Sequence, residues 1–226
     1  MKTKAFLLLT TSLTLGVIVA LFSSCNKDED SGSSTIKDID GNVYHSVTIG
    51  TQVWMVENLK VTKYNDNTSI DNITNTNTWN SLTSGAYCNY NNLDSYVSTY
   101  GRLYNWQAVN TGKLAPKGWR IPTKSDWETL IAFLGGEGVA GGKLKATGSV
   151  WASPNTGATN ESGFSGLPGG CNVNGYVEIG LDGNYWSSTS ETCNFAWFLN
   201  LYKDKSSAEL ACTNKNYGYS VRCIKE

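Results

Sequence analysis

The sequence "KGWRIPTKSDWETL" (Lys117–Leu130) joins an extended arm to the start of an amphipathic helix. Pro122 interrupts the arm, Thr123 can cap the helix, and Asp126 follows three residues after the cap, as in a capping box. Apolar side chains then recur at helical spacing at Trp127, Leu130, Ile131 and Leu134. We therefore predict a helix over about 124–134, ended by the two glycines at 135 and 136.

Two charged side chains of this stretch could belong either to a site or to the scaffold. We expect Arg120 and Glu128 to satisfy each other or nearby backbone groups. On this interpretation the stretch supports a fold that both enzymes and binding proteins can use, and any site lies in the loops.

The first 34 residues have the pattern of a bacterial lipoprotein leader. Two lysines precede an apolar run over 5–22, and "LFSS" leads directly to Cys25. We predict a signal peptide over 1–24, lipidation of Cys25 and an acidic, Ser/Gly-rich tether over 25–34. An ordinary signal peptide followed by a chance cysteine, or a membrane-spanning helix, is the alternative, although the run is at the short limit for spanning.

"CNKDED" at the start of the tether is similar to the export signal of Bacteroidetes lipoproteins. That similarity implies an outer-membrane lipoprotein displayed on the cell surface. The membrane partner is then reached through the lipid anchor rather than through a charged protein face.

Composition excludes several functions. Without the two lysines of the signal, 16 Lys and Arg stand against 19 Asp and Glu, and no basic block occurs, so nucleic acid is not an expected partner. The single histidine, His45, sits in an alternating strand-like segment, where we expect it to face solvent. A site with several histidines is therefore excluded, and a Ser–His–Asp triad could use only His45. Eight Trp, twelve Tyr and 23 Gly indicate a loop-rich α+β or β protein with a core of large rings.

Five cysteines remain once Cys25 is set aside, and an oxidising compartment permits disulfides. Cys193 and Cys212 flank two predicted strands around a polar turn at 203–206, so a Cys193–Cys212 bridge is one hypothesis. A Cys88–Cys223 bridge joining the two ends of the domain is the other. The number is odd, so at least one thiol is free or pairs outside the chain. The absence of CxxC disfavours a zinc or thioredoxin-like site, and the sequence leaves any other metal unknown.

Residues 62–99 are rich in Asn, Thr and Ser, which predicts an extended loop region. Trp79 is either an exposed ring or a plug against the domain. Aromatic rings stack on sugars, and amide groups hydrogen-bond hydroxyls in both directions. The candidate ligand-binding residues are therefore those of this region: Trp79, Tyr87, Asn89, Tyr90 and Asn91.

The rest of the chain alternates predicted elements with turns. We predict short strands over 36–58 with turns at 40–41 and 50–51, and a short helix over 100–110. Residues 141–170 are expected to be irregular. Four further strands are expected after residue 171, in the segments "GYVEIG", "NYWSST", "AWFLNLY" and "GYSVRCIKE".

Seven blocks, in order, resemble the Fibrobacter succinogenes major paralogous domain family: "VTIGTQVWMVENLK", "YGRLYNWQAV", "APKGWRIPTKSDWETL", "GGKLKATG", "GFSGLPGG", "YWSST" and "GYSVRCIKE". The resemblance covers 35–226 as a single domain. It implies a surface or secreted α+β domain with a C-type-lectin-like fold, built from short twisted antiparallel strands, two or three short helices and long irregular loops.

"GWRIPTKSDWETL" is also distantly similar to a block of the formylglycine-generating enzymes, which share that fold. Their catalysis uses a closely spaced cysteine pair near the C-terminus, which this chain lacks, so the resemblance does not carry their activity over. The chain also lacks the Glu-Pro-Asn-like and Trp-Asn-Asp-like segments of calcium lectins. We therefore expect no cofactor, and calcium is unsupported.

These observations favour a non-catalytic surface module that binds glycans or polysaccharide. A structural or adhesin-like role with surface-protein partners is the alternative. An enzyme is the least favoured, because acids such as Glu57, Asp126, Glu128 and Glu178 occur without a motif whose geometry could be checked.

Overall fold

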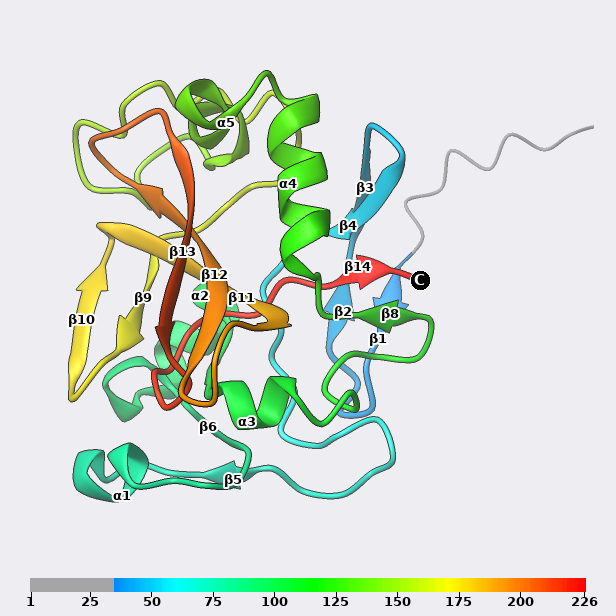
Figure 1. Ribbon diagram of the computed structural model, residues 1–226, viewed down its shortest axis with the longest axis vertical. Coiled ribbons are helices and arrows are strands. Elements are labelled where there is room, and N and C mark those ends of the chain that lie inside the picture. Colours follow the sequence, from blue (N-terminus) through cyan, green and yellow to red (C-terminus); the bar gives the residue numbers. More distant parts are fainter. Residues whose placement is uncertain (1–34) are drawn as a thin grey trace, which may run out of the picture. The chain divides into compact units, whose positions relative to one another are not determined.

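The computed structural model describes residues 35–226 (Figure 1). The predicted signal peptide, Cys25 and the tether lie outside the described residues. Within them, no helix is both long enough and apolar enough to cross a membrane.

The largest sheet has five strands in the order β10-β9-β11-β12-β13. Its strands are β9 (Gly169–Asn172), β10 (Tyr176–Ile179), β11 (Asp182–Ser190), β12 (Phe195–Tyr202) and β13 (Ala208–Asn214). The last three form an antiparallel meander, with Trp186 opposite Phe198 and Leu199 opposite Leu210, and β12 and β13 are the two strands predicted around the turn at 203–206.

Three smaller sheets complete the strand content. A four-stranded sheet has the order β3-β4-β14-β8, with β3 (Ser46–Ile49), β4 (Gln52–Met55), β8 (Trp119–Arg120) and β14 (Ile224–Lys225). The others are β1 (Ile36–Lys37) with β2 (Val43–Tyr44), and β5 (Asp71–Asn72) with β6 (Ala86–Cys88) and β7 (Leu103–Tyr104). The predicted turns at 40–41 and 50–51 connect β1 to β2 and β3 to β4. Two pairings, β9 with β11 and β5 with β6, are parallel, which the expectation of antiparallel strands did not include.

The described helices are short. They are α1 (Thr76–Asn80), α2 (Val97–Tyr100), α3 (Trp106–Val109), α4 (Lys124–Phe133) and α5 (Glu137–Leu144), with 3₁₀ turns at Tyr90–Asn92 and Asp94–Tyr96. The predicted helix over 124–134 is confirmed as α4, and Thr123 and Asp126 form the predicted capping box. Strands and helices together make the chain an α+β protein.

Helices α4 and α5 pack against one side of the β11-β12-β13 meander (Figure 1). The core there is built from rings, as the composition indicated: Trp127 stacks on Trp54 with ring centres 4.6 Å apart, and Phe164 meets Trp54 edge-on at 5.8 Å. A second buried cluster, which includes Tyr104, Trp186 and Tyr219, contains residues of β2, β4, β7, α3 and β11.

Two predictions of irregular backbone were wrong. Residues 62–99 are not one extended loop, because Asn75 caps α1 through a hydrogen bond from the Thr78 backbone N–H, and β6 is fully buried. Residues 141–144, predicted to be irregular, instead form the end of α5, and the helix needs glycines there because it approaches neighbouring backbone too closely for side chains. A Cβ on Gly141 would lie 1.9 Å from the Ser207 carbonyl oxygen, and one on Gly142 would lie 2.2 Å from that of Gly157.

Two further predictions were only partly right. Residues 100–110 contain strand β7 followed by α3 rather than one helix. In "GYSVRCIKE" only Ile224–Lys225 forms a strand, while Tyr219 and Ser220 make isolated bridges.

Replacing two different glycines of α5 by alanine is expected to change the free energy of unfolding in opposite directions. Gly138→Ala is expected to raise the free energy of unfolding by about 0.5–1 kcal/mol, because a Cβ there meets nothing within 4 Å and alanine favours helix. Gly141→Ala is expected to lower it by about 1–3 kcal/mol through the clash with Ser207. Denaturant unfolding of both variants checks this, and equal effects would contradict the close-approach explanation.

Neither predicted disulfide is formed, and all five described cysteines are free. Cys212 lies opposite Trp197 in the β12–β13 ladder, whose register ends where Phe195 meets Asn214, so Cys193 lies beyond that end. Cys88 is buried beside Asn172, whose Nδ2 lies 3.5 Å from the sulfur, and Cys223 belongs to a different buried cluster.

Candidate functional site

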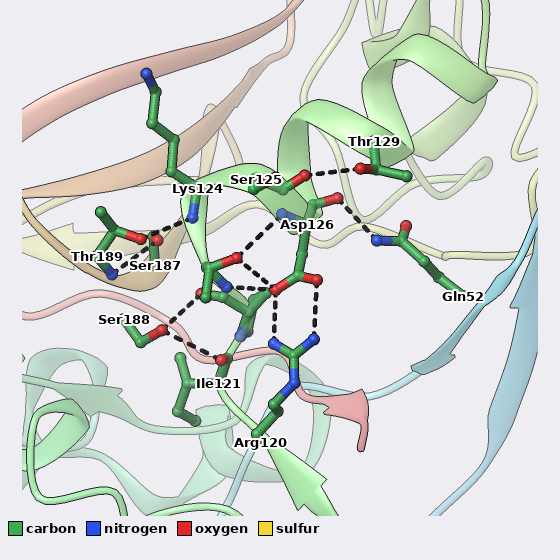
Figure 2. Close-up of polar contacts among 12 residues, drawn as sticks. Gln52, Arg120, Ile121, Lys124, Ser125, Asp126, Thr129, Ser187, Ser188 and Thr189 are labelled. Atoms are coloured by element: carbon green, nitrogen blue, oxygen red, sulfur yellow. Dashed lines mark hydrogen bonds and ion pairs between the residues drawn. The ribbon is translucent and has the colours of Figure 1, made fainter.

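The carboxylate of Asp126 accepts hydrogen bonds from several groups in the stretch that begins α4 (Figure 2). Arg120 donates to both oxygens of Asp126, at 2.6 and 2.9 Å, and the backbone N–H and hydroxyl of Thr123 each donate to Asp126 at 2.7 Å. The predicted pairing of Arg120 with Glu128 is therefore wrong: Glu128 instead lies 3.2 Å from Lys124, one turn away on the exposed side of the helix. Bidentate geometry makes the nearer Asp126 the better partner for a guanidinium.

Asp126→Asn is expected to lower the free energy of unfolding at pH 7 by about 1–2 kcal/mol. Burial alone would raise the pKa of Asp126, but hydrogen bonds from Arg120 and Thr123 outweigh it and hold the pKa below its usual value. A lowered folded pKa adds stability above the unfolded pKa of about 4 and loses it as pH falls through the folded pKa. The gap between wild type and variant should therefore close below about pH 4 in denaturant titrations, and a pH-independent gap would contradict the charge assignment.

The aromatic residues predicted to bind ligand are buried. Trp79 is 0 % exposed, and its indole N–H donates to the Asn216 carbonyl oxygen at 2.7 Å, so the ring is a plug. Tyr87 is also buried, and the Arg102 guanidinium carbon lies 4.7 Å from its ring centre.

The neighbouring predicted residues are engaged as well. Asn89 is buried, donates to Asp94 at 2.6 Å and accepts from Arg102. The buried ring of Tyr90 packs between those of Tyr96 and Tyr176, at 5.3 and 5.4 Å. Of the five predicted residues, only Asn91 is exposed. Together they hold the 62–99 region to the domain and offer no open ring for a ligand.

An accessible tryptophan is found elsewhere, in a hollow of about 410 Å³ between α4, the start of α5 and strands β12 and β13. We call it the Trp197 groove. Its apolar wall includes Ile131, Ala208 and Leu210, and its polar wall includes Lys124, Glu128 and Glu137.

Trp197 stands on β12 and is partly exposed. Its indole N–H donates to Glu191 at 2.5 Å, and the Lys124 ammonium lies 4.0 Å from its ring centre. One aromatic ring, two carboxylates and one ammonium therefore line a concave space that also has apolar walls. Sequence reasoning missed it because "AWFLNLY" predicts the strand but not which of its rings the helices leave partly uncovered.

A second hollow of about 460 Å³ lies beside β8. It is lined by part of the opening stretch, including Lys117, Trp119, Arg120 and Thr123. Trp119 is only 9 % exposed, so this hollow offers less ring surface to a ligand than the Trp197 groove does. The Arg120 guanidinium already donates to Asp126.

The acids considered for catalysis have structural partners. Glu57 lies 2.6 Å from His45, which is exposed as predicted, and Glu178 accepts from the Cys171 thiol at 3.1 Å. Burial, followed by the Glu178 and Asp204 carboxylates, raises the pKa of Asp182 to about 6. Neither hollow described above is lined by Glu178 or Asp182. Among residues 35–226, no three His, Cys, Asp or Glu side chains are grouped to hold a metal.

The described strands and helices, together with the motifs found in the sequence, define the chain as an α+β protein. The family model described as the Fibrobacter succinogenes major domain matches residues 47–225, which is most of the chain. The chain belongs to that family. The searches of curated proteins and of solved structures found no match to this chain.

Proposed function

We propose that this protein is a non-catalytic glycan-binding module whose ligand occupies the Trp197 groove. The observation that carries the proposal is a partly exposed tryptophan in a concave space lined by Glu128 and Glu137, with Glu191 bonded to the indole N–H. Sugar C–H faces pack on aromatic rings, and carboxylates accept hydrogen bonds from hydroxyls. We further propose a C-type-lectin-like fold, with Cys25 lipidated and the domain displayed on the outer membrane, as the sequence motifs suggest.

The binding test uses the full chain, purified in detergent, on an array of plant, mucin and bacterial glycans with and without calcium. For a glycan that binds, Trp197→Ala is expected to raise the Kd by about tenfold or more, because the stacking ring is lost. Phe195→Ala is the matched control, since Phe195 is an exposed aromatic residue two positions along the same strand and outside the groove. Absence of binding to every glycan would overturn the function, and equal loss in both variants would overturn the site.

A protein partner is the second candidate. Phe133 and Val139, near the junction of α4 and α5, are 63 % and 47 % exposed, and large exposed apolar side chains are available for protein contacts. Pull-down from outer-membrane extracts with the wild type and with Phe133→Ser tests this candidate function. A stoichiometric partner that is lost in the variant supports a protein partner. The absence of a partner for both forms contradicts it.

A further inference from the structure

Lys124 links the helix cap to the Trp197 groove. Its backbone N–H donates to the Thr189 hydroxyl at 2.9 Å, which fixes the first residue of α4 against β11. Its side chain points away from the Arg120–Asp126 network (Figure 2) and brings the ammonium to 4.0 Å from the ring centre of Trp197. The start of α4 therefore places a cation over the ring that the ligand needs.

A sugar ring and an ammonium use a tryptophan in the same way. Both lie against the π face at van der Waals distance, so both cannot occupy one face together. We propose that Lys124 is an intramolecular competitor, which covers the stacking face of Trp197 until a glycan displaces it. This inference rests on the proposed function, and it makes Lys124 a residue that sets the affinity of the groove.

The competitor has a second partner besides the ring in the same structure. Glu128 lies 3.2 Å from the Lys124 ammonium, one helical turn away, and its side chain is 52 % exposed. A lysine that leaves the ring keeps this carboxylate as a partner. An exposed cation–π contact corresponds to about two- to fivefold in an equilibrium constant, so displacement is a small cost to a ligand.

The charges around the ring also indicate the ligand class. Glu128 and Glu137 line the groove and Glu191 accepts from the Trp197 indole N–H, whereas Lys124 is the only cation that lines the groove among the described residues. Lys124 already pairs with Glu128, and among the described residues neither Glu137 nor Glu191 forms an ion pair. The groove therefore favours neutral glycans over those that carry carboxylates or sulfates.

The first test needs no ligand. N-bromosuccinimide oxidises accessible indoles, and peptide mass mapping of the full chain reports oxidation of Trp197 separately from the other tryptophans. Lys124→Ala, which leaves no side chain long enough to cover the ring, is expected to raise the rate at Trp197 about two- to fivefold. The matched control is Lys143→Ala, because Lys143 lies 3.1 Å from Glu161 with side chains 32 % and 58 % exposed, against 34 % and 52 % for Lys124 and Glu128. An unchanged rate in Lys124→Ala would show that the lysine does not cover the ring and would overturn the inference.

The second test measures affinity by calorimetry for cellohexaose, xylohexaose and mannohexaose as neutral probes and hexagalacturonate as an acidic one. Lys124→Ala is expected to bind a neutral probe about two- to fivefold more tightly than wild type, with Lys143→Ala unchanged and hexagalacturonate weakest. If Lys124→Ala binds neutral probes equally or more weakly while Trp197→Ala still loses affinity, the competitor role of Lys124 is overturned and the site is not. Unchanged affinity in Trp197→Ala overturns the proposed site, and no binding by any form overturns both proposals.

Discussion

Replacing Arg222 by methionine is expected to lower the free energy of unfolding by about 3–5 kcal/mol, as measured by denaturant unfolding at pH 7. Arg222 is 0 % exposed, so its guanidinium is a fully desolvated cation. It donates twice to the Asn58 carboxamide oxygen, at 2.7 and 3.1 Å, and to the carbonyl oxygens of Met55 and Phe164, at 3.2 and 2.6 Å. Methionine would fill much of the space but leave these three oxygens without their donor.

The position of Arg222 explains why the loss is large. The guanidinium carbon lies 4.4 Å from the ring centre of Phe164 and 5.6 Å from that of Tyr185. One side chain therefore joins the segment after β4, the loop before β9 and the aromatic core under α4. Removing it releases contacts between segments far apart in the sequence.

One further variant separates the planar donor geometry of the Arg222 guanidinium from its positive charge, and a second serves as the control. Arg222→Lys keeps the cation but loses the planar donor geometry, so an intermediate loss is expected. Arg102→Met removes a partly exposed arginine that also donates to backbone, the Lys60 carbonyl oxygen at 2.9 Å, and should cost less. A methionine variant of Arg222 that is as stable as wild type would mean that apolar packing fully compensates for the buried cation.

The sequence predicted elements whose signals are local. Thr123, Asp126 and the apolar stripe of α4 lie within one short segment, and capping chemistry acts between near neighbours. The turns at 40–41 and 50–51 and the two strands around the turn at 203–206 were also predicted, because turn residues and strand patterns are recognised within a few positions.

Predictions failed where the deciding contact is distant in sequence. Gly141 suggested irregular backbone, and only the approach of Ser207 explains why a helix needs glycine there. Trp79 and Tyr87 matched a binding composition, but Asn216 and Arg102 engage them. Trp197 carried no separate signal, because its exposure depends on how α4 and α5 cover the sheet.

Lys145 offers the second large effect: Lys145→Met is expected to lower the free energy of unfolding by about 3–5 kcal/mol. Lys145 is 0 % exposed, and its ammonium donates to the carbonyl oxygens of Thr156, Tyr202 and Lys205 at 2.9, 2.7 and 2.8 Å. Burial lowers the pKa of Lys145 to about 8, so at pH 7 the amine still carries three N–H donors, one for each carbonyl.

The three carbonyls belong to two separate loops, so Lys145 fastens the segment around Thr156 to the turn between β12 and β13. Lys203→Met is the matched control: Lys203 lies on the same turn, and its ammonium reaches a single carbonyl, that of Ser153, at 3.3 Å in an exposed position. Its loss should cost at most about 1 kcal/mol, because water replaces an exposed contact. Hydrogen exchange at the backbone amide of Thr156, which donates to the Lys203 carbonyl oxygen at 2.7 Å, should rise in Lys145→Met before global unfolding, since the two segments separate first. Equal stability of the two variants, with unchanged exchange, would show that water satisfies the three carbonyls and that Lys145 does not hold the loops together.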